Sequence, residues 1–363
     1  MTSQQQTRNP GLDLLRLAAV LLVMGRHIYW PADANPVTAD FFSIRRGGWI
    51  GVDIFFVLSG FLVSGLLFNE YKNTGSLRIG RFLIRRALKI YPAFWCLLLP
   101  TILVFVLISN HAGVSPPFRG IFGELLFMQN YIGRLWGHTW SLAIEEHFYI
   151  GFALFLAIAK VEWVPRLCVY TFVFCLAMRF LASTQDFRFD AVMIPTHFRI
   201  DSLMAGVYLS YGVHFYRLDY FLRRVKTWIF FAMGVTLLLP AFIFTLETTW
   251  WIPVFGLTLF YVGSMSLVYG AYRIRSIPKK MRGLQRLGAG SYSIYLWHLS
   301  VGNMLAPFLL QMLGIKDYWA YLAAYFIGAL ALGLWMARLI ENPVLRIRNR
   351  VFPSGVAAVI ATK

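Results

Sequence analysis

The segment GVDIFFVLSGFLVSGLLF, residues 51–68, decides the fold. Its only charged side chain is Asp53, and a helix that crosses a bilayer needs about 20 largely apolar residues. Similar stretches recur along the 363 residues, of which 58% are hydrophobic and only 14% are charged. The mean hydropathy of +0.62 exceeds that of water-soluble proteins of this size. The sequence therefore predicts an integral membrane protein without a sizeable soluble domain.

The apolar stretches predict an all-α fold, a polytopic integral membrane helical bundle with about ten transmembrane helices. One further stretch, 120–133, is too short to span the bilayer comfortably, and we expect it to be interfacial or re-entrant. The predicted spans are 12–30, 49–68, 90–109, 140–159, 167–182, 197–216, 228–246, 252–272, 291–310 and 318–340.

The loop charges set the predicted orientation, because Lys and Arg accumulate on the cytoplasmic side. With both termini cytoplasmic, most of the basic residues between spans fall on that side. We therefore expect a cytoplasmic N-terminal tail at 1–11, a transmembrane domain at 12–343 and a basic cytoplasmic C-terminal tail at 344–363. A net charge of +18 would indicate a nucleic-acid partner in a soluble protein. Here the basic residues lie between apolar stretches, so we interpret them as topology signals and as partners for anionic ligands and the lipid bilayer. We expect no nucleic acid as partner.

Two ionisable residues of the first predicted helix share one face. Arg16 and His27 are 11 residues apart, which places them about 20° apart around the helix axis and about 16.5 Å apart along it. Asp13, three residues before Arg16, is expected to pair with its guanidinium. Because an ionisable group within a membrane span costs several kcal/mol, we treat each one as a functional candidate.

Three carboxylates are expected at the depth of His27. Asp53, Glu145 and Asp201 each lie near the outer start of a predicted span. A carboxylate beside a histidine is the minimal set for general base catalysis, since it orients the imidazole and stabilises its charged form. The topology therefore predicts one layer in which Asp53 or Glu145 orients His27.

Adjacent glutamates at the start of the fourth predicted span cannot share a helix face. We expect Glu145 to face the cavity, because Trp140, Ser141 and Tyr149 lie on its side of the helix, and Glu146 to find another partner.

For three further polar residues, a structural and a functional interpretation carry equal weight. Arg199 and Asp201 either close a helix end as a salt bridge or line the cavity, and His298 is either a satisfied interior hydrogen bonder or a site residue. Tyr292 lies in the same segment as His298, SYSIYLWH at 291–298, and is expected to line the cavity.

A basic rim is expected on the cytoplasmic side, with Arg81, Arg85, Arg86 and Lys89 in a geometry suited to phosphate groups. Ordinary positive-inside bias explains most of this rim equally well. The sequence contains no spacing typical of metal ligands, so we expect no metal.

These motifs resemble acyltransferase family 3, a family of integral membrane enzymes. The likeness runs from residue 12 to about residue 343, and Lys89 and His147 stand where the family usually has Arg and Gln. It rests on Arg16 with His27 as R-x10-H, on GVDIFFVLSGF at 51–61, on RRALKIYP at 85–92, on Trp140-Ser141-Leu142 with Glu145, and on 291–298.

The resemblance implies an O-acyltransferase of the bacterial cytoplasmic (inner) membrane. It would move an acyl group, commonly acetyl from acetyl-CoA, to a hydroxyl of a carbohydrate, a glycolipid or a small acceptor, and the R-x10-H pair would be essential. Acyl-CoA is then a co-substrate, and no tightly bound cofactor is expected. Some relatives carry an additional extracytoplasmic hydrolase-like domain. We expect the acceptor here to reach the membrane cavity directly, or a separate protein to complete the transfer.

The residues leave two mechanisms and two rival functions open. Arg16, Arg85, Arg86 and Lys89 are expected to bind the donor, while His27 either deprotonates the acceptor or carries the acyl group covalently. A proton-coupled transporter or flippase of a lipid-linked sugar would use similar buried ionisable groups, although the sequence shows no internal repeat. A passive membrane scaffold would tolerate polar substitutions at His27 and Glu145.

Overall fold

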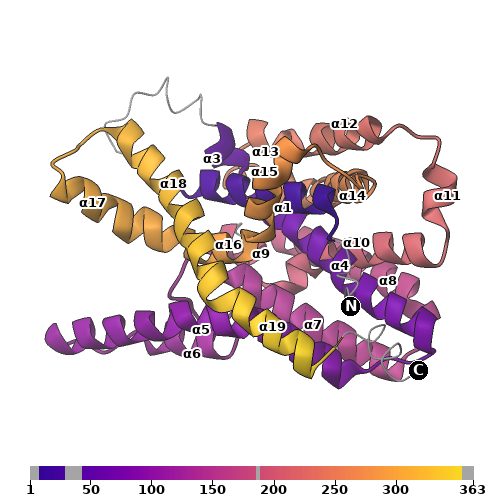
Figure 1. The fold of residues 1–363 in the computed structure, drawn as a ribbon, viewed down its shortest axis with the longest axis horizontal. Coiled ribbons are helices and arrows are strands. Elements are labelled where there is room, and N and C mark those ends of the chain that lie inside the picture. The colour runs from indigo at the N-terminus through magenta and orange to yellow at the C-terminus, as the bar shows by residue number, and fades with distance from the viewer. Residues whose placement is uncertain (1–7, 29–42, 185–188, 354–363) are drawn as a thin grey trace.

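A computed structural model describes residues 8–28, 43–184 and 189–353. Within these residues the fold is all-helical, without a strand, as the sequence predicts. Figure 1 shows a bundle from which two arms project to one side, one formed by α5 (Ile79–His111) with α6 (Phe118–Leu125) and one by α17 (Ala306–Met312).

The remaining α-helices up to residue 193 are α1 (Pro10–Arg26), α3 (Ser43–Gly47), α4 (Ile50–Thr74), α7 (Trp140–Ile158), α8 (Val164–Ser183) and α9 (Phe189–Met193). The second half adds α10 (Thr196–His214), α11 (Leu218–Leu222), α12 (Thr227–Leu238), α13 (Pro240–Ile243), α14 (Leu257–Tyr272), α15 (Arg282–Ala289), α16 (Ser291–Ser300), α18 (Tyr318–Met336) and α19 (Asn342–Val351). One π-helical turn precedes α14, another joins α16 to α17, and a third, Ala337–Glu341, joins α18 to α19.

Seven helices of the described residues are long and apolar enough to cross a membrane, so the chain is a multi-pass membrane protein. Each of the ten predicted spans contains a helix in its described part, but α1, α10 and the segment Thr227–Ile243 are too short or too polar to be among the seven. Ten crossings and two cytoplasmic termini stay predictions.

Helix α4 lies at the centre of the bundle, because it is apolar on every side. It packs most extensively on α10, and the close approach depends on glycines: a Cβ at Gly60 would collide with the carbonyl of Leu203, and a Cβ at Gly206 with that of Val57. Gly60 and Gly206 are therefore packing residues, because only glycine leaves room for the two backbones to approach this closely. This contact decides which polar side chains of α4 and α10 meet.

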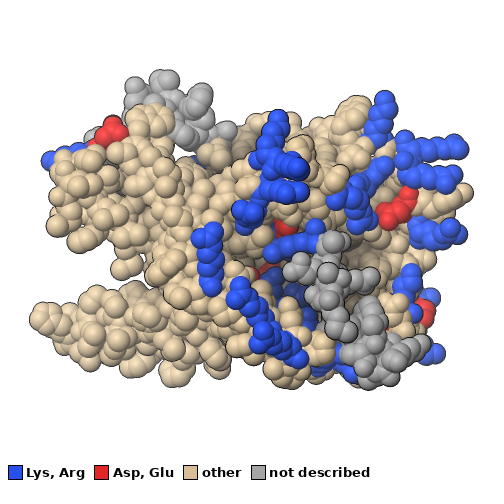
Figure 2. Space-filling model, viewed as in Figure 1, with Lys and Arg blue, Asp and Glu red and all other residues tan. Residues whose placement is uncertain are grey.

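The two arms expose apolar side chains, as helices in contact with lipid do. Leu99, Leu103 and Leu107 on α5 are all more than half exposed. In Figure 2 the arms are almost bare of Lys and Arg, which gather over α11, α15 and α19. These three helices belong to segments that the loop charges place on one common side of the membrane. The predicted interfacial stretch, 120–133, overlaps α6, which is too short to span.

The first and last observed helices extend beyond the predicted boundaries of the transmembrane domain. The first helix begins at Pro10, two residues before the predicted start, because the side chain of Asn9 accepts from the backbone N–H of Leu12 and caps it. The last helix continues through the π-helical turn to Val351, beyond the predicted boundary at residue 343. Residue 30, where the first span was expected to end, lies outside the described residues.

Candidate active site

Three cavities follow one another through the bundle. The basic cavity, of about 650 Å³, meets the central cavity, of about 120 Å³, at Arg8, Arg16, Arg86 and Lys89, which line both. The central cavity meets the histidine cavity, of about 280 Å³, at Val52 and Tyr295. The basic cavity takes its name from Arg8, Arg16, Arg81, Arg85, Arg86, Lys89, Arg275 and Arg348, and the histidine cavity from His27 and His138.

One face of α7 supplies the polar wall of the central cavity. Ser141, Glu145 and Tyr149 follow one another at intervals of four residues, so the helix presents them on one side. The Ser141 hydroxyl lies 2.5 Å from that of Tyr295, and the Ser59 hydroxyl lies 2.6 Å from that of Tyr149 and also bonds Glu145. The expectation that Glu145 faces a polar cavity is confirmed.

The neighbouring Glu146 points elsewhere and accepts a hydrogen bond of 3.0 Å from the Tyr91 hydroxyl. This confirms that the two adjacent glutamates have different partners.

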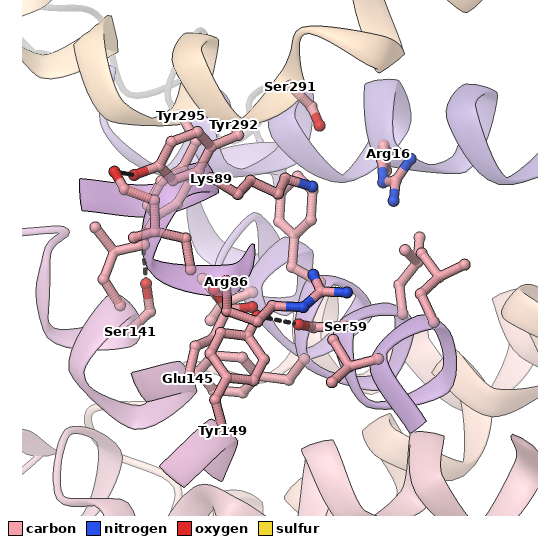
Figure 3. Close-up of a pocket in the computed structure, with 18 of the residues that line it drawn as sticks. Arg16, Ser59, Arg86, Lys89, Ser141, Glu145, Tyr149, Ser291, Tyr292 and Tyr295 are labelled. Atoms are coloured by element: carbon pink, nitrogen blue, oxygen red, sulfur yellow. Dashed lines mark hydrogen bonds between the residues drawn. The ribbon is translucent and has the colours of Figure 1, made fainter. Parts of the chain in front are cut away.

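Three cations reach the space around Glu145. Figure 3 shows Arg16, Arg86 and Lys89 extending their nitrogen atoms into the same region. Arg86 lies over the ring of Tyr149, with 5.8 Å between its guanidinium carbon and the ring centroid. Among the described residues, no carboxylate forms an ion pair with Arg86 or Lys89. Their charge is therefore available to an anionic ligand.

The other basic residues of the rim differ in their partners. Arg16 donates to Asp13 at 2.8 Å, which confirms the predicted pair. Arg81 pairs with Glu70, and Arg85 donates to the carbonyl of Phe352. Both arginines line the basic cavity and not the central one.

His27 lies in the histidine cavity, at the end of α1. Its Nδ1 lies 2.9 Å from the carbonyl oxygen of Val23 and 3.4 Å from Nε2 of His298. Trp140 and Arg199 line the same cavity. Since His27 and Glu145 line different cavities, the prediction that Glu145 orients His27 is wrong. Val52 and Tyr295 lie where the two cavities meet, between His27 and Glu145.

The prediction that Asp53 orients His27 is also wrong. Asp53 accepts from Arg199 at 2.9 Å and from the Ser202 hydroxyl at 3.0 Å. Arg199 therefore does not pair with Asp201, which instead accepts from Arg179 at 2.7 Å. The close α4–α10 packing brings Asp53 and Arg199 together, and a buried guanidinium requires a carboxylate partner.

Comparison with known proteins identifies the family. The family model of the acyltransferase domain matches residues 9–338. The chain belongs to acyltransferase family 3. It is similar to the peptidoglycan O-acetyltransferase OatA of Listeria monocytogenes, with 26% identity over 83% of this chain and 50% of that protein. It is also similar to the O-acetyltransferase OatA of Staphylococcus aureus, with 27% identity over 94% of this chain and 58% of that protein. The chain spans about half the length of the curated relatives it matches. No solved structure matches it.

In this family 3 chain, the sequence interpretation missed His138. It lies in the loop before α7, buried beside His298, with 4.9 Å between the ring centroids. Burial lowers the pKa of the His138 imidazole to about 3, and the nearby His27 adds to this effect, so the ring is neutral. A histidine outside the helical pattern offered no periodicity from which to place it.

Two other cavity residues were missed. Arg8, assigned to the N-terminal tail, pairs with Asp13 at 3.1 Å. Glu341, from the π-helical turn after α18, accepts from the Ser293 hydroxyl at 2.9 Å, and both Arg8 and Glu341 line the basic and central cavities. Both come from chain ends that sequence spacing does not relate to the rest of the site.

The predicted Tyr292 does line the central cavity, and its hydroxyl donates to the carbonyl of Ile90.

Proposed function

We propose that this chain is a membrane O-acyltransferase that moves an acetyl group from acyl-CoA, bound on the cytoplasmic side of a bacterial inner membrane, to a hydroxyl of a carbohydrate or glycolipid. Membership of acyltransferase family 3 and the similarity to O-acetyltransferases support the reaction class. The observation that carries the proposal is the series of three cavities, which leads from a cluster of cations to His27.

The basic cavity suits the donor. CoA carries several phosphate charges at one end and a thioester at the end of a neutral arm. Arginine and lysine bind phosphate through charge-assisted hydrogen bonds. In our proposal Arg81, Arg85 and Arg348 lie near the phosphates, and the arm enters the central cavity past Arg16 and Lys89.

Glu145 makes the central cavity suitable for a neutral arm. In our proposal its carboxylate offsets part of the positive charge that Arg16, Arg86 and Lys89 bring to the central cavity. We assign Glu145 this electrostatic role and assign Asp53 a structural one, since Asp53 is held by Arg199.

His27 carries the chemistry. In the proposed step it takes the proton of the acceptor hydroxyl while the oxygen attacks the thioester carbonyl; the C–S bond breaks, and the departing thiolate receives the proton. Transient acylation of His27 is the alternative form of the same reaction. The acceptor occupies the histidine cavity, whose walls include Trp49 and Trp140.

CoA release by the purified full-length protein in detergent tests the proposal. We expect the wild type to release CoA from acetyl-CoA in the presence of a membrane glycan extract, and His27→Ala to release none. His111→Ala is a matched control, because His111 is exposed at the end of α5. A transporter or flippase would leave acetyl-CoA chemically intact in all three samples, and this result would overturn the proposal.

The acceptor is identified separately, by mass spectrometry of surface glycans and lipids from cells with and without the protein. We expect a difference of one acetyl mass on the acceptor.

A further inference from the structure

Three imidazoles from three separate elements meet beside the histidine cavity. His27 ends α1, His298 lies on α16 and His138 lies in the loop before α7. The ring centroids are 5.1 Å apart between His27 and His298, and 4.9 Å apart between His298 and His138. His298 is fully buried between the other two.

The protonation of His298 follows from its backbone contact. Its Nδ1 lies 2.5 Å from the carbonyl oxygen of Tyr295. A carbonyl oxygen can only accept, so Nδ1 must carry the hydrogen. In the neutral ring Nε2 then has the lone pair, and this atom faces Nδ1 of His27 at 3.4 Å.

The same argument applies to His27. Its Nδ1 lies 2.9 Å from the carbonyl oxygen of Val23, so this nitrogen also carries the hydrogen. Nδ1–H is directed at two acceptors, the Val23 carbonyl and Nε2 of His298. The lone pair of neutral His27 is therefore on Nε2.

We propose that His298 is a positioning residue, which with the Val23 carbonyl holds His27 as the Nδ1–H tautomer and makes Nε2 the atom that reacts. The inference rests on the proposed function. In the transfer step, Nε2 takes the proton from the acceptor hydroxyl as the new C–O bond forms and the C–S bond breaks, and Nε2–H then returns this proton to the CoA thiolate.

His298 thus takes the role that the sequence assigned to a carboxylate. When His27 gains a proton, Nδ1–H remains directed at two acceptors, which stabilise the positive charge and the ring orientation. A neutral acceptor gives less stabilisation than a carboxylate, but it adds no second buried charge.

His138 supports this arrangement from the other side. Its Nε2 lies 3.1 Å from the carbonyl oxygen of Leu296, so it donates to the helix that carries His298. Its ring packs edge-on against that of His298, at an interplanar angle of 75°.

Two substitutions of His298 separate the proposed role from a purely structural one. His298→Gln places an amide oxygen near the position of Nε2 and keeps an acceptor for His27. His298→Asn places an amide N–H near the position of Nδ1 and keeps only the bond to the Tyr295 carbonyl. Because a general base contributes about 10²- to 10⁴-fold, we expect Asn to lower kcat for CoA release about 10- to 100-fold and Gln to stay within about threefold. KM for acetyl-CoA should be unchanged in both.

Better activity in the Asn variant than in the Gln variant, equal loss in both, or wild-type kcat in both would overturn the proposal. A second measurement reads the tautomer in the wild-type protein and does not depend on activity: ¹⁵N NMR with labelled histidine rings, in which the His27 signal is assigned by its absence from the spectrum of His27→Asn. We expect Nδ1 of His27 to carry the hydrogen, and hydrogen on Nε2 alone would overturn the inference. Absence of CoA release from the wild type would instead contradict the proposed function, and the NMR result would still decide the tautomer.

Discussion

Arg199 binds Asp53 at 2.9 Å across the contact between α10 and α4, and both side chains are buried. Because Asp53 is held in this pair, it is not the partner of His27 that the sequence predicted. Breaking a buried ion pair by removing one partner typically costs about 3–5 kcal/mol, because the other charge stays buried without compensation.

We therefore predict that Asp53→Asn lowers the melting temperature of the protein in detergent by several degrees, while kcat of the folded fraction falls far less than in His27→Ala. Thermal unfolding and CoA release on the same preparation measure both quantities. Loss of CoA release with an unchanged melting temperature would show that Asp53 acts in catalysis and not in folding.

Lys89 is expected to bind the donor, because it lies where the basic and central cavities meet and has no ion-pair partner among the described residues. A hydrogen bond to a charged group contributes about 1.5–3 kcal/mol, so Lys89→Gln should raise KM for acetyl-CoA about tenfold or more. The increase should shrink as salt concentration rises.

Lys316→Gln is the matched control, since Lys316 is exposed in the loop between α17 and α18. A KM for Lys89→Gln equal to that of this control would show that the basic cavity does not hold the donor.

Tyr295 is expected to limit the size of the acyl group. Its hydroxyl contacts Ser141 at 2.5 Å and donates to the carbonyl of His138 at 2.7 Å, and its side chain lies where the central and histidine cavities meet. Truncation to Ala should widen this junction, and a methylene group in an apolar pocket changes specificity about 10-fold or more.

We predict that Tyr295→Ala raises the ratio of butyryl-CoA to acetyl-CoA turnover about tenfold, whereas Tyr295→Phe, which keeps the ring, leaves the ratio near that of the wild type. The two turnover rates are compared in one assay of CoA release. An unchanged ratio in the Ala variant would mean that the acyl group does not pass Tyr295.

We predict that His138 makes the folded protein less stable in acid. Burial lowers its pKa in the folded state to about 3, below the value of 6.5 expected in the unfolded chain. Its contribution to stability is therefore complete above pH 6.5 and is lost progressively as the pH falls towards 3. Between pH 6.5 and pH 5 the free energy of unfolding falls by about 2 kcal/mol through this residue.

His138→Gln keeps an N–H for the Leu296 carbonyl and removes the titration. We expect the fall in melting temperature between pH 7 and pH 5 to be smaller in this variant than in the wild type. An identical fall in both proteins would show that the pKa of His138 does not differ between the folded and the unfolded state.

Sequence spacing predicted the features that a single helix determines. The pair of Asp13 with Arg16, and the shared face of Ser141, Glu145 and Tyr149, follow from helical periodicity. Apolar length likewise predicted the helices, because each span must satisfy its own backbone hydrogen bonds.

Features that depend on how helices meet were beyond the sequence. The glycine contact between α4 and α10 determines the partner of Asp53. Side chains of α4 and α16, Val52 and Tyr295, lie between His27 and Glu145. His138 lies in a loop held by Glu124, which accepts hydrogen bonds from the backbone of Leu135 and from the Thr139 hydroxyl. Such long-range contacts leave no periodic signal in one chain.

The central claim is that His27 performs the transfer while the cations bind the donor. The most direct test measures acetyl-CoA binding by calorimetry and CoA release by thiol detection on the same sample of His27→Ala. We predict an acetyl-CoA dissociation constant equal to that of the wild type and no CoA release. Release at the wild-type rate would contradict the account.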